Sequence, residues 1–224
     1  MSEHILAVDT THEFGSLALL CGLETIEEVL LHSPGGFGQI LFERIGQLFE
    51  RHGWKADDVE CFAAASGPGS FTGVRVGLAC VKGLAEATGK PVAAVSNLAA
   101  IATFGSAALR ATVLDARRGA VYGAVYDAHG AAVCPEVVMP FAAWLETLPA
   151  GDLEFVSTDF SPFGAALAGT RFADAPITTA PRALAAAIGR MACERLRAGR
   201  AEDPAAIDAN YVRLADAQLF WKES

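Results

Sequence analysis

The residues Ser66-Gly67-Pro68-Gly69-Ser70-Phe71-Thr72-Gly73-Val74-Arg75 decide the fold, because they form a small, flexible turn between two segments of regular structure. Before them, Cys61 to Ala65 is an apolar run of strand length. After them, Thr72 to Ala87 has helical spacing, and a second strand-like run extends from Val92 to Val95. The stretch therefore predicts a β-strand, an α-helix and a parallel β-strand, with a glycine-rich turn after the first strand.

The glycine-rich turn can bind an anion, or its glycines can serve the geometry of the turn alone. Gly67 and Gly69 can adopt positive φ, and Ser70 or Thr72 can cap the helix, so the free amides of its first turn can face a ligand. These four residues are the candidate contacts for an anion or for a nucleotide at an interface. Strand-to-helix turns also contain glycine and proline without any ligand.

The turn lacks both of the stronger nucleotide signatures. Val74 and Arg75 stand where a P-loop has lysine followed by serine or threonine. The spacing of the glycines also differs from that of the dinucleotide fingerprint, and Ser96 and Asn97 follow the next strand in place of an acid.

Length and composition indicate a soluble protein with a large core. The chain has 224 residues, of which 52% are hydrophobic, and charges interrupt each long apolar stretch. No secretory signal is visible at the N-terminus, and five scattered cysteines form no Cys-x-x-Cys pair, so we expect a cytoplasmic protein with reduced thiols. The net charge of −9 disfavours nucleic-acid binding without a partner.

The first hundred residues predict a definite order of elements. Three strands of alternating pattern are followed by a helix with one apolar face that ends near Gly53. Together with the strand, helix and strand around the glycine-rich turn, this order is the ribonuclease H-like topology. The three strands are Ile5 to Thr10, Phe14 to Leu20 and Thr25 to Leu31, and the helix extends from Ile40 to Phe49.

A weaker copy of this pattern begins after Gly105. Thr112 to Asp115 ends a strand on an acid, as Leu6 to Asp9 does, and Val121 to Tyr126 is the next strand in the copy. We therefore predict an α/β protein with an N-terminal lobe, 1–103, and a reduced C-terminal lobe, 104–224, whose terminal helix can pack back on the first lobe. Its further elements are strands at Val133 to Val138 and Glu154 to Ser157, and helices near Phe141 to Leu148, Pro162 to Ala168 and Pro181 to Ala198, followed by the apolar segment Tyr211 to Trp221.

Two ribonuclease H-like lobes, each with an acid at the end of its first strand, resemble the superfamily of actin, sugar kinases and heat-shock ATPases. Its active members place a glycine next to this acid, so that a phosphate can approach the backbone. Here Asp9 is followed by Thr10-Thr11, and Asp115 by Ala116-Arg117-Arg118. We therefore expect no cofactor and no ATP turnover by this chain alone.

The chain contains the segments Ile5 to Thr10, Ser66 to Gly77, Asp115 to Tyr122 and Tyr211-Val212-Arg213. Together these segments resemble the TsaB family, formerly called YeaZ. The resemblance covers nearly the whole chain. This chain has Gly36-Phe37-Gly38-Gln39 where many members have histidine and serine or threonine, and Ala209-Asn210 where proline is frequent, which can alter the partner surface.

The resemblance implies a non-catalytic scaffold subunit of the bacterial assembly that adds a threonylcarbamoyl group to the adenosine next to the anticodon of ANN-decoding tRNAs. The implied partners are the catalytic paralogue TsaD, as a heterodimer, and the ATPase TsaE, while TsaC makes the threonylcarbamoyl-adenylate that TsaD transfers. A homodimer is implied when TsaD is absent. Contact with tRNA is implied only through the complex, and no contact with a membrane is implied.

Two other functions are weighed against the scaffold, namely a glycoprotease-like peptidase and a small-molecule kinase of the same superfamily. A peptidase needs a nucleophile, a base and an orienting acid, but Ser70 has no histidine near it in the sequence. A kinase needs Asp9 or Asp115 as base and a phosphate loop. The metal pair of the catalytic paralogue, two histidines four residues apart, is absent from the five histidines here, so we predict neither catalytic nor metal residues.

The helix after the glycine-rich turn has small residues along one side, which lets another backbone come close. They either pack on the chain's own sheet or form a bundle with a homologous subunit, and the family resemblance favours the bundle. The predicted interface residues are Ile40, Ile45, Leu48, Gly73, Val74, Gly77, Cys80 and Val81.

Overall fold

A computed structural model of the chain describes residues 3–210 and residue 212. The chain divides into two compact units, the first formed by residues up to 97 together with 182–210, and the second by 98–181. The sequence analysis assigned everything after residue 103 to the second lobe. In the structure, residues 182–210 belong to the first unit, because helix α6 (Ala185–Arg197) packs on the sheet of that unit.

The first unit contains a five-stranded sheet of order β3-β2-β1-β4-β5. Strands β1, β2 and β3 pair antiparallel, and β4 and β5 add parallel to β1, which confirms the ribonuclease H-like topology predicted for this part. Its elements are β1 (His4–Asp9), β2 (Phe14–Cys21), β3 (Glu24–His32), η1 (Phe37–Gln39), α1 (Leu41–His52), η2 (Ala56–Asp58), β4 (Cys61–Gly67), α2 (Phe71–Thr88) and β5 (Val92–Ser96).

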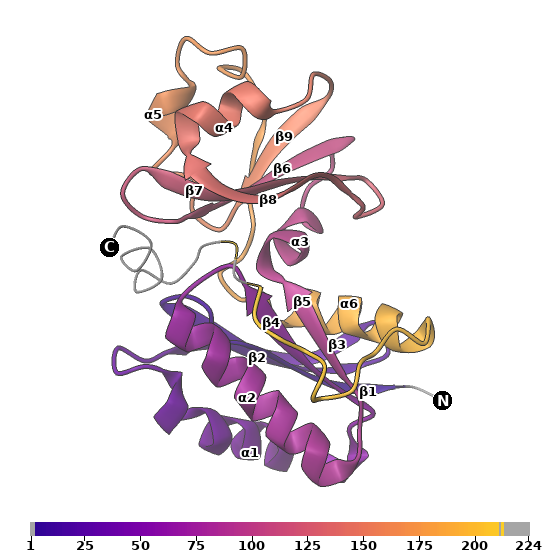
Figure 1. The fold of residues 1–224 in the computed structure, drawn as a ribbon. Helices are drawn as coiled ribbons and strands as arrows, with labels where there is room; N and C mark the ends of the chain where they lie inside the picture. The colour runs from indigo at the N-terminus through magenta and orange to yellow at the C-terminus, as the bar shows by residue number, and fades with distance from the viewer. Residues whose placement is uncertain (1–2, 211, 213–224) are drawn as a thin grey trace, which may run out of the picture. The chain divides into compact units, whose positions relative to one another are not determined.

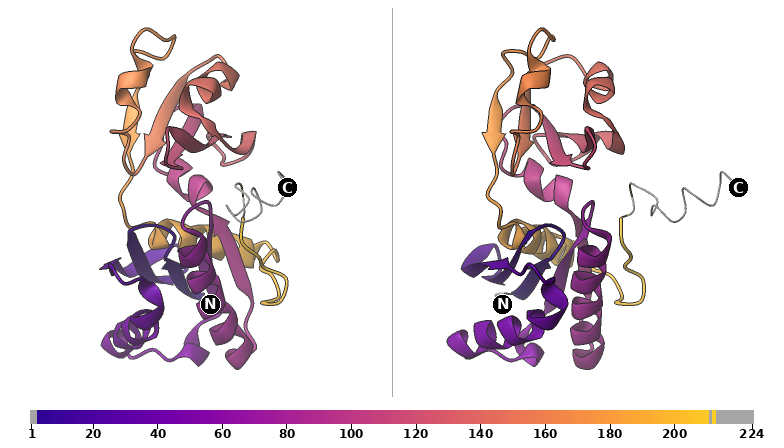
Figure 2. Two further views of the ribbon diagram at one scale, coloured as in Figure 1. Left: turned by 60° about the vertical axis from the view of Figure 1, so that its left-hand side comes forward. Right: turned by 90° about the vertical axis from the view of Figure 1, so that its left-hand side faces the viewer.

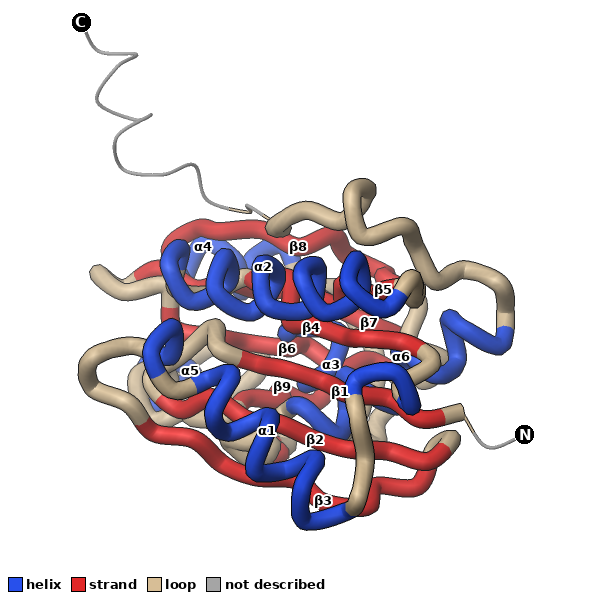
Figure 3. Tube along the Cα trace, turned by 90° about the horizontal axis from the view of Figure 1, so that it is seen from below, coloured by secondary structure: helices blue, strands red, loops and turns tan. Residues whose placement is uncertain are grey.

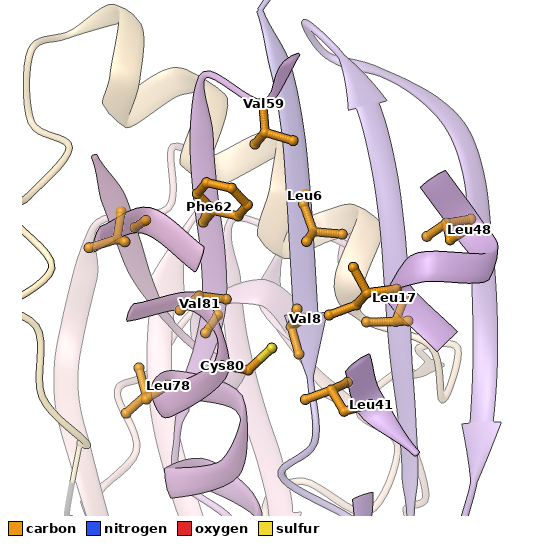
Figure 4. Packing of buried hydrophobic residues seen from close by; sticks show 14 of the residues in the cluster. Leu6, Val8, Leu17, Leu41, Leu48, Val59, Phe62, Leu78, Cys80 and Val81 are labelled. Carbon is orange, nitrogen blue, oxygen red and sulfur yellow. The ribbon is translucent and has the colours of Figure 1, made fainter. Parts of the chain in front are cut away.

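Helices cover both faces of the first sheet. Figures 1 and 2 show α1 and α2 on one face and α6 on the other, and Figure 3 shows α1 and α2 in front of the strands. The alternation along β2 follows this arrangement, because Leu17 and Leu19 enter the core under α1 and α2, whereas Leu20 contacts α6 at Gly189. Figure 4 shows this core, in which Phe62 and Val81 lie beside Leu6 and Val8.

The second unit repeats the strand order of the first. Its sheet has the strand order β10-β9-β6-β7-β8. Strands β6, β7 and β8 pair antiparallel, β9 pairs parallel with β6, and β10 pairs parallel with β9, as the predicted duplication requires. A short helix, α3, and the strand β10 were not predicted. The elements are α3 (Asn97–Ala102, which begins on the last residue of the first unit), β6 (Leu109–Asp115), β7 (Ala120–Asp127), β8 (Ala132–Pro140), α4 (Phe141–Thr147), β9 (Leu153–Ser157), α5 (Gly164–Leu167) and β10 (Ile177–Thr179).

Aromatic side chains form the core of the second unit between its sheet and helices α4 and α5. The ring of Phe141 lies 4.8 Å from that of Phe163, and the rings of Phe155 and Phe160 are 5.3 Å apart. The helices that cover this face are shorter than α1 and α2, which fits the prediction of a reduced lobe.

The last described helix begins later than its sequence pattern indicates. The pattern predicts a helix from Pro181, whereas α6 starts at Ala185, because the Ser16 hydroxyl on β2 accepts hydrogen bonds from the backbone N–H groups of Leu184 and Ala185. Its end agrees with the prediction, since Gly199 has a φ of 64° just after the helix. The segment Tyr211 to Trp221, expected to pack back, lies outside the described residues except for Val212.

Candidate functional site

The first candidate site lies where β1 ends on the buried side chain of Asp9. Its Oδ1 atom accepts hydrogen bonds from the backbone N–H and the hydroxyl of Thr11, at 2.9 and 2.6 Å. Its Oδ2 atom accepts one from Nδ2 of Asn97 at 3.3 Å, and Oδ1 of Asn97 accepts from the Gly67 backbone N–H at 3.1 Å. Both carboxyl oxygens thus accept hydrogen bonds from residues that follow β1 and β5, and Asn97 extends the network to the end of β4.

Sequence reasoning missed the roles of Thr11 and Asn97. Asn97 is fully buried, and it follows β5 directly at the edge of the sheet where β1 and β4 also end. A polar amide directly after a parallel strand was the available signal, because the carboxyl ends of parallel strands meet at one edge. The pattern gave no sign that this amide would bind the Asp9 carboxyl.

The glycine-rich turn packs directly against the loop after β1. The Ser70 hydroxyl caps α2 by accepting from the Gly73 N–H at 3.2 Å, as predicted, and the Ser70 N–H donates to the Thr11 carbonyl at 2.7 Å. Gly67 has a φ of 103°, also as predicted. Gly69 is a correction: its φ is not in the positive region, and a glycine is needed because a Cβ there would lie 2.5 Å from the Thr11 carbonyl oxygen.

A cleft of about 410 Å³ opens beside the start of α2. Of the four predicted ligand contacts, Ser70 and Thr72 line it, whereas Gly67 is buried and Gly69 lies against Thr11. Binding of an anion or nucleotide there stays a prediction. The remaining walls are Thr10, His12, Glu13, residues 33–39, Gly73 and Val76, so one of the two departures from the family pattern, Gly36 to Gln39, lies in this cleft.

The predicted interface residues face the chain's own core, which is a correction. A Cβ on Gly77 would lie 2.7 Å from the Thr10 hydroxyl oxygen, and a Cβ on Gly73 would collide with the Thr10 carbonyl. Burial also raises the pKa of the Cys80 thiol to about 12. The small side of α2 therefore packs on β1 inside the first unit. Ile45, Leu48, Gly73, Val74, Gly77, Cys80 and Val81 are buried, and Ile40 is half-buried.

The opposite sides of α1 and α2 are exposed and carry apolar groups. Phe42 on α1 is 60% exposed and Phe71 at the start of α2 is 43% exposed. The Arg75 guanidinium lies 3.8 Å from the centroid of the Phe71 ring, and further along α2 a Cβ on Gly83 would meet no atom within 4 Å. Together with exposed Ala79, these residues define the outer face of α1 and α2.

The second candidate site is the corresponding strand end in the second unit. Asp115 ends β6, as Asp9 ends β1, but it is half-buried, and its Oδ1 atom accepts from the Arg117 backbone N–H at 2.7 Å. A cleft of about 590 Å³ lies beside this loop. Its walls are Asp115, Arg117, Arg118, Gly119, Pro140, Phe141, Ala142, Pro162, Phe163 and Ala166.

The described residues offer neither a metal centre nor a membrane-spanning helix. Across 3–210 and 212, no group of three or more histidine, cysteine, aspartate and glutamate side chains could hold a metal ion. The helices in that part of the chain are too short or too polar to cross a membrane.

Solved structures define the class of protein. A structure named YeaZ from Pseudomonas aeruginosa superposes with a TM-score of 0.78 at 25% identity, covering 93% of this chain and 99% of that one. The (R)-2-hydroxyglutaryl-CoA dehydratase component A of Acidaminococcus fermentans shares the fold alone, with a TM-score of 0.56 at 11% identity, covering 88% of this chain and all of that one. The chain thus has the two-lobed, ribonuclease H-like fold of the actin, sugar kinase and heat-shock ATPase superfamily.

Sequence comparisons identify the family. The profile described as "TsaD: tRNA N6-adenosine threonylcarbamoyltransferase" matches residues 37–207. The "tRNA threonylcarbamoyladenosine biosynthesis protein TsaB" of Bacillus subtilis is 30% identical over 98% of both chains, and the Escherichia coli protein of the same name is 34% identical over 55% of this chain and 54% of its own. The chain belongs to this glycoprotease-like family, in its TsaB (YeaZ) branch.

Proposed function

We propose that this chain is a non-catalytic subunit in the biosynthesis of tRNA threonylcarbamoyladenosine, and that it supports the threonylcarbamoyltransferase TsaD in the cytoplasm. The names of the Bacillus and Escherichia relatives support the pathway, and the TsaD profile supports common ancestry with the transferase. The proposed partners are TsaD, TsaE and, without TsaD, a second copy of the chain. The tRNA is contacted within the complex.

The closed hydrogen-bond network around Asp9 is the observation that supports a non-catalytic role best. A strand-end acid that acts on a nucleotide must be accessible to it and needs space for a phosphate. Asp9 is only 1% exposed. Here both carboxyl oxygens accept bonds from Thr11 and Asn97, and the turn at Gly69 packs against Thr11. The residues that hold a phosphate in active members of the superfamily are therefore used to join β1, β4 and β5.

The outer face of α1 and α2 is the surface that we propose for the partner. It combines two exposed phenylalanines with an arginine and with small residues that let a facing helix come close. Aromatic residues and arginine are enriched at the centres of protein interfaces. This assignment keeps the pair of helices named by the sequence analysis and moves the contact to their exposed side.

A pair of matched variants tests the partner surface. Phe42→Glu removes a 60% exposed side chain from α1, and Leu30→Glu removes a 50% exposed side chain from β3 in the same unit. We expect Phe42→Glu to weaken TsaD binding at least tenfold by isothermal titration calorimetry, and Leu30→Glu to bind as the wild type does. Equal binding by both variants would place the interface elsewhere.

A reconstituted transfer assay tests the function itself. Purified chain, TsaD, TsaE, threonylcarbamoyl-adenylate and unmodified tRNA are combined, and the modified nucleoside is quantified with and without this chain. We expect modification to depend on the chain, while the chain alone hydrolyses neither ATP nor peptides above background. ATP hydrolysis that disappears in Asp9→Ala would favour the kinase alternative, and peptide hydrolysis lost in Ser70→Ala would favour the peptidase.

A further inference from the structure

The turn between β6 and β7 contains three consecutive residues in the left-handed region. Arg117 has a φ of 67°, Arg118 of 56° and Gly119 of 73°. The Ala120 N–H donates to the Arg117 carbonyl at 3.0 Å, so Arg118 and Gly119 are the two central residues of a tight hairpin turn. Such a turn needs positive φ at both central positions.

Arginine is not the residue that this geometry selects. Asparagine or glycine fits the first central position, whereas an arginine side chain there is unfavourable, and Arg117 extends the strain by a further residue. Neither arginine is buried, so neither contributes packing that would offset the strain. Two strained, exposed arginines in sequence indicate that their guanidinium groups serve a ligand.

The surroundings of the turn define the chemistry of that ligand. The Arg117 side chain is 83% exposed, and its Nη1 lies 3.5 Å from Asp115 Oδ2, the acid among the cleft walls. Within residues 3–210, the backbone N–H groups of Arg118 and Gly119 have no hydrogen-bond acceptor. Two guanidinium groups and two free amides on one strained turn suit an anion with several oxygens.

We propose that the turn 115–120 binds a backbone phosphate of the RNA substrate, with the sugar of that nucleotide at the adjoining cleft of about 590 Å³. This inference rests on the proposed function, which supplies the RNA. A phosphodiester is favoured over a partner carboxylate because guanidinium groups and free amides together form a typical phosphate site. The chain as a whole has a net charge of −9 and repels RNA, so a contact must be local.

The test uses the chain in complex with TsaD and a fluorescently labelled, unmodified transcript of an ANN-decoding tRNA. Arg118→Asn is the main variant, because asparagine fits the turn and the fold is retained. Arg118→Lys keeps the charge, and Arg200→Gln removes one exposed charge from the first unit as the matched control. Size-exclusion chromatography first establishes that the wild type and each variant bind TsaD, and failure of the wild type to bind contradicts the proposed function separately.

We expect Arg118→Asn to raise the melting temperature of the chain, because strain is relieved, and to weaken tRNA binding by the complex about fivefold to tenfold near 0.1 M salt. The slope of log affinity against log salt should fall by about 1. Arg118→Lys should lose less, and Arg200→Gln should bind as the wild type does. Unchanged tRNA affinity in Arg118→Asn overturns the proposal, and so does loss of TsaD binding, which would assign the turn to a protein contact.

Discussion

The two strand-end loops occupy the same topological place in the two sheets, yet their chemistry is opposite. After β1, Asp9 is buried and both its oxygens accept internal hydrogen bonds. After β6, Asp115 is half-buried, and the loop extends into solvent with Arg117 and Arg118. The strand-end acid is thus buried within a hydrogen-bond network in the first unit, whereas in the second it begins an exposed cationic turn.

The largest expected effect is the difference in stability between variants that lack one or the other of these two acids. Asp9→Ala leaves the buried donors of Thr11 and Asn97 without their acceptor, so we expect a loss of about 2 to 4 kcal/mol in the free energy of unfolding. Asp115→Ala removes a half-buried carboxyl and should cost below about 1 kcal/mol. Urea unfolding followed by circular dichroism measures both, and equal losses would show that the two acids have equivalent roles.

The second prediction concerns the packing of α2 on the loop after β1. Gly77→Leu introduces a side chain whose Cβ lies 2.7 Å from the Thr10 hydroxyl oxygen, and we expect about 1 to 3 kcal/mol of destabilisation. Gly83→Leu, on the open side of the same helix, should stabilise by about 0.5 to 1 kcal/mol, because an interior glycine is replaced. Both values come from urea unfolding. A stable Gly77→Leu protein would mean that α2 does not pack tightly on β1.

The third prediction compares the helices that follow β4 and β9. Ser70 caps α2 with its hydroxyl, whereas Phe163 precedes α5 and offers no side-chain acceptor. Ser70→Ala should therefore cost about 1 kcal/mol, and Ser70→Asp should restore most of it. Ser161→Ala, a serine before the short helix, should change stability by less than about 0.5 kcal/mol. Thermal melts of the three variants measure these changes. An equal loss of stability in Ser70→Ala and Ser161→Ala would contradict the prediction.

The smallest expected effect concerns α6, which packs on the sheet of the first unit. The Arg197 guanidinium donates to the Glu3 carboxylate at 2.8 Å and lowers the pKa of Glu3 from 4.5 to about 2. A pKa that is lower in the folded state gives stability above pH 4.5 that is lost as the pH falls towards 2. Glu3→Gln should make the melting temperature depend less on pH over this window. The change should be small, because the pair is exposed. An unaltered dependence of the melting temperature on pH would show that the ion pair does not stabilise the packing of α6.

Patterns along the sequence predicted the topology because strands and helices have distinct periods, and both sheets follow the predicted order. They did not predict β10, because three residues carry too little alternation. Small residues at Gly73 and Gly77 indicated a close approach, but their spacing cannot tell which segment approaches. In the structure it is Thr10 of the same chain, directly after β1. The network of Asp9 with Asn97 joins residues 88 positions apart, and only the fold brings them together.

The position of α6 has a consequence for how the protein is made. The first sheet obtains its last helix only after residues 98–181 have been synthesised, since α6 spans Ala185–Arg197. At roughly 5 to 20 residues per second, the ribosome needs on the order of 4 to 17 s for that stretch. During this interval the α6-facing side of the nascent sheet, including Leu20 and the Ser16 hydroxyl, is bare. Translation speed across the second unit thus sets how long the nascent chain presents an apolar surface to chaperones.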